Sequence, residues 1–192
     1  MPFSESHLFA VLTRVDDKGV RGVEPNVFGV EYACSARQAS DGSREIPMAQ
    51  YIPSPRGWVR EQVELYERTN GAEGNTLRDT GLPVIIVTNI GNKTGAIRKT
   101  PLMRVKDGTN YILVGSMGGA PNDPVWVHNL RANPEVELRD LSVVQKMGVR
   151  EVKDAAERAR VWKIAVAAYP PYAEYQTRTT RQIPVFVAEP VR

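Results

Sequence analysis

A run of polar residues between two glycines, Gly91-Asn92-Lys93-Thr94-Gly95, is the part of this sequence best suited to hold an anion. The glycines permit a tight turn with exposed backbone N–H groups, to which Lys93 and Thr94 add an ammonium and a hydroxyl. Arg98 follows closely, and a guanidinium can bind two phosphate or carboxylate oxygens at once. The glycine spacing of a nucleotide-binding P-loop is missing. The pattern predicts a site for a small anionic group, with a solvated hairpin as the alternative.

A second candidate segment, Gly115-Ser116-Met117-Gly118-Gly119-Ala120-Pro121, joins an expected strand to an expected helix. Ser116 can donate a hydrogen bond, and the paired glycines allow a flat ring to approach the backbone. We expect Asp123 to cap the helix, on which Trp126 and Asn129 share one face. The segment therefore predicts one wall of a ligand site, with an ordinary loop beside a core tryptophan as the alternative.

Three tyrosines at three-residue spacing, Tyr169, Tyr172 and Tyr175, form the third candidate segment. Pro170 and Pro171 stiffen the chain between the first two phenols. Phenols on one side of a segment can form an amphipathic lid over an aromatic substrate. The alternative is that they close one end of the protein core.

Short apolar runs bounded by turn residues predict strands between these segments, and amphipathic runs predict helices. The expected strands span residues 84–88, 99–106, 111–115, 135–138, 143–152 and 184–188. The expected helices follow Pro55, cover 124–132 and 155–168, and include part of 169–181. Many antiparallel strands with few helices predict an α+β fold built on a closed or nearly closed barrel.

The composition, with 192 residues of which 42% are hydrophobic and 24% charged, fits one globular domain. The only cysteine is Cys34 and the only histidines are His7 and His128, so we expect neither disulfides nor a metal site. Residues 1–47 lack sustained periodicity, and we expect a disordered or non-native extension before a domain at 48–192. Met48 is our candidate for the physiological start.

The charge of the chain argues against a nucleic-acid binder. The formal net charge is +3, and the residues after position 47 carry 20 basic and 15 acidic side chains. This moderate bias suits a small anionic ligand, and the basic residues are interspersed with acids. No apolar run approaches the roughly 20 residues that span a bilayer, and we expect a cytoplasmic protein.

Taken together, these segments resemble the deazaflavin-dependent nitroreductase family of actinobacteria over about residues 53–190. The positions that carry the resemblance are Gly91-Asn92-Lys93-Thr94-Gly95, Arg98, Thr100-Pro101-Leu102, Ser116, Gly118-Gly119, Pro124, Trp126, Asn129-Leu130, Ala132-Asn133-Pro134, Tyr169-Pro170 and Gln182-Ile183-Pro184-Val185. The resemblance implies a split β-barrel, an FMN-binding-like antiparallel barrel with peripheral helices. It also implies coenzyme F-420, which has a flat deazaflavin ring and an anionic phosphate and polyglutamate tail.

The resemblance further implies a role for each matching residue. By similarity, the tail would be held by Asn92, Lys93, Thr94 and Arg98, and the ring would be lined by Thr100, Pro101, Leu102, Ser116, Met117, Gly118, Gly119, Val125, Trp126 and Asn129. Two positions depart from relatives, which have a lysine in place of Met117 or a tyrosine in place of Met103. The residues expected to orient the substrate are Ser116, Tyr169, Tyr172 and Tyr175.

The reaction implied by the resemblance is hydride transfer from reduced F-420 to a quinone, enone or nitroaromatic acceptor. In such a reaction the protein supplies orientation and electrostatics. Two alternatives stay open, an FMN-binding split-barrel oxidoreductase and a non-catalytic F-420 carrier. We expect a monomer or homodimer that binds no nucleic acid, with peripheral membrane contact through a quinone substrate.

Overall fold

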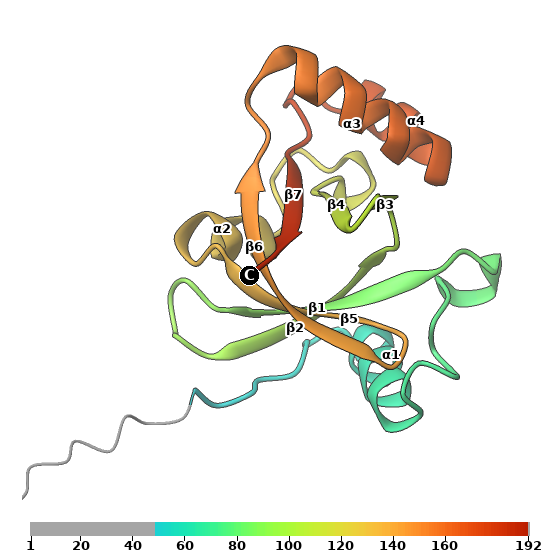
Figure 1. Cartoon of the computed structure of the whole chain (residues 1–192), viewed down its shortest axis with the longest axis vertical. Coiled ribbons are helices and arrows are strands. Elements are labelled where there is room, and N and C mark those ends of the chain that lie inside the picture. Colours follow the sequence, from blue (N-terminus) through green and yellow to red (C-terminus); the bar gives the residue numbers. More distant parts are fainter. Residues whose placement is uncertain (1–48, 192) are drawn as a thin grey trace, which may run out of the picture. The chain divides into compact units, whose positions relative to one another are not determined.

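Seven antiparallel strands form a single sheet in the computed structural model, which describes residues 49–191 (Figure 1). The strands are β1 (Val84–Ile90), β2 (Ile97–Met103), β3 (Lys106–Asp107), β4 (Asn110–Val114), β5 (Glu135–Asp140), β6 (Val143–Glu151) and β7 (Val185–Pro190). Their order across the sheet is β2-β1-β5-β6-β7-β4-β3. The expected extension over residues 1–47 lies outside the described residues, as does Met48.

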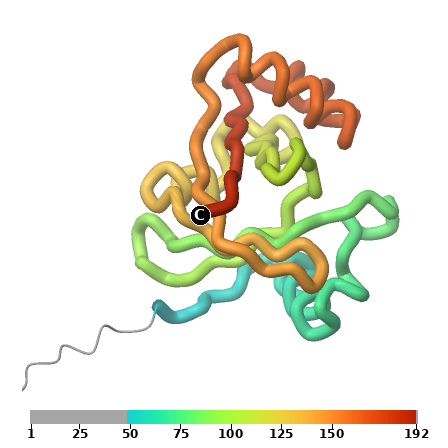
Figure 2. The backbone as a smooth tube through the Cα atoms, in the orientation of Figure 1, coloured from blue at the N-terminus to red at the C-terminus, as the bar shows by residue number. Residues whose placement is uncertain are grey.

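The two edges of this sheet lie near each other because a very short connection joins them. β2 and β3 occupy opposite edges, yet only Arg104 and Val105 separate them in the chain. In a flat sheet, six strand spacings would place these edges about 29 Å apart. The connection reaches about 11 Å at most. The sheet must therefore curl into a half-closed barrel, which the backbone trace in Figure 2 follows, and the predicted α+β barrel is confirmed.

Alternate strand residues divide the apolar side chains into two clusters, as the period of two in a strand requires. The inner cluster contains Ile85, Val87, Tyr111, Leu113, Val136, Leu138, Met147, Val149, Phe186 and Ala188 from the strands. The helix α2 (Val125–Ala132) adds Trp126, Val127 and Leu130 to it. The inner cluster is the barrel core, and α2 is the helix that packs into it.

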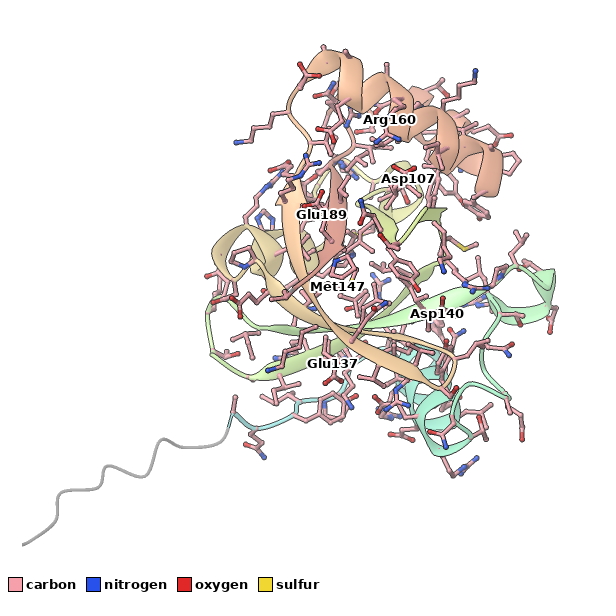
Figure 3. The ribbon with its side chains drawn as sticks, viewed as in Figure 1. Asp107, Glu137, Asp140, Met147, Arg160 and Glu189 are labelled. Atoms are coloured by element: carbon pink, nitrogen blue, oxygen red, sulfur yellow. The ribbon has the colours of Figure 1, made fainter. Side chains whose placement is uncertain are left out.

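The outer cluster joins the opposite face of the strands to the other helices. It contains side chains from α1 (Gly57–Arg68), α3 (Ala155–Ala168) and α4 (Pro171–Thr177). Asp154 caps α3 as predicted, because its carboxylate accepts a hydrogen bond from the Glu157 N–H at 2.8 Å. Arg160 of α3 pairs with Asp107 of β3 at 2.7 Å (Figure 3). The Arg160–Asp107 pair holds α3 against the β3–β4 hairpin.

The start of α2 differs from the prediction. Pro124 occupies the N-cap position, and no side chain caps the helix. The carboxylate of Asp123 instead accepts hydrogen bonds from Arg131 at 2.9 Å and from Arg181 at 2.8 Å. The predicted cap was wrong because Arg131, near the end of α2, and Arg181, 58 residues away, both bond to this carboxylate.

A buried carboxylate occupies the barrel interior where β5 ends. Asp140 accepts hydrogen bonds from Arg104 Nε at 2.8 Å and from the Tyr111 hydroxyl at 2.7 Å (Figure 3). Burial and the bond to Asp140 raise the pKa of Tyr111 to about 12. The Tyr111 phenol therefore keeps its proton around neutral pH. Within residues 49–191, no helix has the length and apolar character needed to cross a bilayer.

Candidate active site

The predicted anion-binding segment forms the turn between β1 and β2. Gly91 N–H donates to Ala96 O at 2.7 Å and Gly95 N–H donates to Gly91 O at 2.8 Å, which closes the turn. Gly95 has a φ of +65°, a conformation that glycine adopts at little cost. Thr94 Oγ1 accepts from Ala96 N–H at 3.3 Å, so this hydroxyl also shapes the turn. The side chains of residues 92–94 are exposed at its tip.

The two cations of this segment carry charge that no nearby acid neutralises. Within the described residues, neither Lys93 nor Arg98 forms an ion pair, whereas nine other pairs are present. Arg98 is half-buried and donates one hydrogen bond to Ile52 O at 3.2 Å, which steadies its guanidinium. Two uncompensated cations beside a tight turn attract a phosphate or carboxylate.

Asn129 holds the turn from inside the protein. Its Oδ1 accepts from Asn92 N–H at 3.0 Å, and its Nδ2 donates to Asn89 Oδ1 at 2.8 Å. Asn129 is 4% exposed and Asn89 is 2% exposed, so both amides are buried. Asn133 Nδ2 adds a bond of 3.3 Å to Ile90 O. Asn129 thus joins α2 to the turn, and its predicted direct contact with a ligand stays a prediction.

Three consecutive residues predicted to line a ring lie on two faces of β2. Thr100 and Leu102 pair with Val87 and Ile85 and therefore face the inner cluster. Pro101 pairs with a β1 residue of the outer cluster. Side chains of Thr100 and Leu102 can line the same ligand, whereas Pro101 points to the opposite face of the sheet.

The second predicted segment forms a tight loop between β4 and α2. Ser116 is buried at its start, and the following turn η2 (Met117–Gly119) has positive φ at all three residues, 46°, 68° and 83°. A Cβ at Gly119 would lie 2.7 Å from Tyr175 O, whereas none of the described atoms lies within 4 Å of one at Gly118. The loop therefore packs on α4 through Gly119 and is open at Gly118.

Exposed apolar side chains stand in this loop and at the start of α2. Met117 is 43% exposed and Val125 is 75% exposed, and both were predicted to contact the ring. Trp126, by contrast, is buried against Phe186 with ring centroids 5.9 Å apart, so it belongs to the core. The surface beside Gly118 suits the face of a flat, largely apolar ring.

Arg181 is a site residue that the sequence interpretation missed. Its guanidinium donates to the carbonyl oxygens of Gly115, Ser116 and Ala120 at 3.0, 2.9 and 2.8 Å, and to Asp123 at 2.8 Å. These partners lie about 60 residues upstream, and no local motif marks the contact. Arg181 ties both ends of the loop together.

The three predicted tyrosines come together beside this loop. Their ring centroids lie 4.9, 6.1 and 6.3 Å apart, and the hydroxyls of Tyr169 and Tyr175 are 3.1 Å apart. Burial and the bond to Tyr175 raise the pKa of Tyr169 to about 12. Tyr172 is fully inside the outer cluster, and burial raises its pKa as well. Tyr169 and Tyr175 are the partly exposed members, and the Tyr169 phenol keeps its proton near neutral pH.

The arrangement fits a ligand with an anionic tail and a flat ring. Uncompensated cations stand at the β1–β2 turn, and the β4–α2 loop has an open glycine and the exposed Met117. Asn129 bonds to the β1–β2 turn, and Arg181 bonds to the β4–α2 loop. A curled antiparallel barrel with these features fits the expected class, the split-barrel oxidoreductases that bind a coenzyme.

Comparisons with known proteins name the family within this class. The family model described as F420H(2)-dependent quinone reductase matches residues 58–190, and the chain belongs to this family. An F420H(2)-dependent quinone reductase of Mycobacterium tuberculosis is 36% identical over 131 residues, which cover 67% of this chain and 87% of that protein. The resemblance to F-420-dependent reductases is thereby confirmed.

Solved structures support the same fold. A structure of an F420-H2 dependent reductase is 47% identical, with a TM-score of 0.53 over 56% of this chain and 94% of its own. A second structure, described as a domain-swapped dimer, is 44% identical, with a TM-score of 0.55 over 71% of this chain and 100% of its own. The predicted split β-barrel is confirmed.

Proposed function

We propose that this chain transfers a hydride from reduced coenzyme F-420 to a quinone. The observation that carries the proposal is the family match over residues 58–190, which includes both predicted binding segments. The family confirms the predicted coenzyme, the reductase activity and the quinone as acceptor. The individual site residues below are our own assignments.

The two segments divide the coenzyme between them. We assign the anionic tail to Lys93 and Arg98, whose charges have no acidic partner within the described residues. We assign the ring to the Met117–Gly119 turn and to the inner face of β2 at Thr100 and Leu102. When bound, the reduced coenzyme supplies the hydride, and the protein supplies a fixed position for the ring.

The tyrosines would complete the acceptor side. Tyr169 and Tyr175 share a hydrogen bond, and the raised pKa of Tyr169 keeps its phenol a donor near neutral pH. A donated hydrogen bond would stabilise negative charge as it develops on a quinone oxygen. The buried rings would also exclude water from the acceptor. Ser116, buried at the start of the β4–α2 loop, is our second candidate donor.

We also infer peripheral contact with a membrane for a protein located in the cytoplasm. Quinones partition into lipid, and Met117 and Val125 expose apolar surface beside the site. Flotation of the protein with lipid vesicles, with and without an embedded quinone, tests this inference. The solved relative described as a domain-swapped dimer makes a homodimer one arrangement to test by light scattering.

A binding and turnover experiment tests the function. Purified protein is titrated with F-420 and, separately, with FMN while ring fluorescence is followed, and reduced F-420 is then mixed with a soluble quinone. We expect F-420 binding and quinone-dependent oxidation of the coenzyme. Tight FMN binding without F-420 binding would favour the FMN alternative, and F-420 binding without oxidation by quinone, enone or nitroaromatic would favour the carrier.

A further inference from the structure

The guanidinium of Arg181 bonds to residues near both ends of the loop between β4 and α2. Arg181 is 15% exposed in its side chain, and its three nitrogens donate to three backbone carbonyls and to Asp123. A planar guanidinium with fixed donors specifies where each of these acceptors lies, which a single ammonium does not. Arg181 therefore fixes the loop at both its first residues and its last.

The loop needs such a restraint because its backbone is strained. Met117 has a φ of 46°, and Gly118 and Gly119 follow with φ of 68° and 83°. A non-glycine residue in the left-handed region costs about 1–2 kcal/mol. Such conformations persist only where surrounding contacts hold them. The bonds from Arg181 to the carbonyls on either side of this turn supply that hold.

The bonds from Arg181 use carbonyl oxygens of the loop and leave two of its N–H groups available to a ligand. The carbonyls of Gly115, Ser116 and Ala120 point to Arg181. Within residues 49–191, by contrast, no group accepts a hydrogen bond from the N–H of Met117 or of Gly118. The loop thus directs acceptors to the protein side, while two adjacent N–H groups at the open glycine keep their hydrogens for a ligand.

A chain of ion pairs orients Arg181 in turn. Asp123 accepts from Arg181 through Oδ1 at 2.8 Å and from Arg131 through Oδ2 at 2.9 Å. Arg131 also makes two bonds to Glu151 on β6, at 3.0 and 2.6 Å. The network anchors the guanidinium to α2 and to the barrel, which are both rigid elements.

We propose that Arg181 is a positioning residue that sets the β4–α2 loop in the conformation that receives the deazaflavin ring. This inference rests on the proposed function and adds a residue that acts on the ring through Ser116–Gly119. Arg181 does not touch the reacting atoms. It controls coenzyme affinity and the rate of hydride transfer by controlling where the loop lies.

The test compares Arg181→Met and Arg181→Lys with Arg160→Met, a matched control. Arg160 pairs with Asp107 at 2.7 Å but lies on α3, away from the loop. We expect Arg181→Met to weaken F-420 binding about tenfold and to lower kcat on the order of 100-fold, the effect of a small misplacement. The KM for quinone should stay within about twofold. Arg181→Lys should recover part of both losses, and Arg160→Met should match the wild type.

Three measurements separate a positioning role from a structural one. Circular dichroism selects folded variants, fluorescence titration gives the F-420 affinity, and the absorption band of bound F-420 reports the ring environment. A folded Arg181→Met protein with wild-type affinity, band and kcat would overturn the inference. If this variant does not fold, Arg181→Lys and Asp123→Asn carry the test with the same expected direction. Failure of the wild type to bind F-420 would instead overturn the proposed function.

Discussion

The two segments that we assign to the coenzyme are held in place by different means. The β1–β2 turn is held by neutral amides, since Asn129 bonds to Asn92 N–H and to Asn89. The β4–α2 loop is held by ions, since Arg181 and Asp123 are charged. Neutral support leaves the charges of the turn available for an anion. The charges behind the β4–α2 loop are paired with each other and with backbone carbonyls, and a flat ring does not need them for binding.

The residues that hold a binding segment in place can thus be matched to the charge of its ligand. A carboxylate behind the turn would neutralise Lys93 or Arg98 and would weaken the attraction for a phosphate. An amide fixes the backbone without that effect. Behind the loop, the carbonyl oxygens need a strong donor, and a guanidinium provides several in one plane.

Removing the charge of the turn should have the largest effect. Hydrogen bonds to charged groups contribute about 1.5–3 kcal/mol each, so the double change of Lys93→Ala with Arg98→Ala should weaken F-420 binding on the order of 100-fold or more. The wild-type affinity should also fall with added salt, and the double variant should lose most of that dependence. Fluorescence titration at several salt concentrations measures both effects.

The exposed Lys163→Ala on α3 is the control for this double change. It removes a positive charge from the protein without touching the turn, and its affinity should equal that of the wild type. A double variant that is folded and binds F-420 as tightly as the control would show that the cations do not hold the tail.

Two adjacent glycines should separate support of the loop from contact with the ring. Gly119→Ala would place a Cβ 2.7 Å from Tyr175 O at a φ of 83°, and we expect about 3 kcal/mol of destabilisation. Gly118→Ala meets no atom within 4 Å and should cost about 1 kcal/mol, from its φ alone. Gly118→Ala should nonetheless weaken F-420 binding, because its methyl group occupies the open side.

Urea denaturation and fluorescence titration measure the two glycine variants. The assigned roles of the two glycines are wrong if Gly118→Ala binds F-420 as tightly as the wild type and Gly119→Ala is as stable as the wild type. That result would mean that the loop neither packs through Gly119 nor receives the ring at Gly118.

Breaking the neutral support should have an intermediate effect. Asn129→Ala leaves the buried Asn89 amide and Asn92 N–H without partners, at a cost of about 1–3 kcal/mol in the free energy of unfolding. F-420 affinity should fall about tenfold as the turn loosens, while its salt dependence should stay, because both cations remain. The control is His128→Ala, an exposed neighbour on α2. Loss of the salt dependence in Asn129→Ala would contradict the division between support and charge.

The sequence was most informative about the parts of the site that are local in the chain. The β1–β2 turn, the glycine loop and the three tyrosines are each local in the chain, and the structure brings each together as a unit. The strands that build the barrel were also predicted, because each is a short apolar run bounded by turn residues.

The supports were not predictable because they connect residues far apart in the chain. Asn129 contacts positions 37 and 40 residues away, and Arg181 contacts positions 58 to 66 residues away. Asp123 matched the pattern of a helix cap, but tertiary ion pairs outweighed that local preference. A support residue leaves no local motif, since its partners are backbone groups and side chains far from it in the chain.

Acid should loosen the charged support alone, with the smallest effect. The bonds from Arg131 lower the pKa of Glu151 from its usual 4.5, so this carboxylate stabilises the fold above that pH and less so as the pH falls through its lowered pKa. Glu151→Gln should remove that part of the acid dependence and cost below about 1 kcal/mol near neutral pH. Glu189→Gln, in the more exposed pair with Arg150, is the control. Thermal unfolding at pH 3 to 7 measures the difference. Among residues 49–191, the side chains that bond to the β1–β2 turn from α2 and its end are amides, which do not titrate. Asn129→Ala should therefore follow the wild-type acid profile. A profile altered as in Glu151→Gln would show that the two supports are coupled.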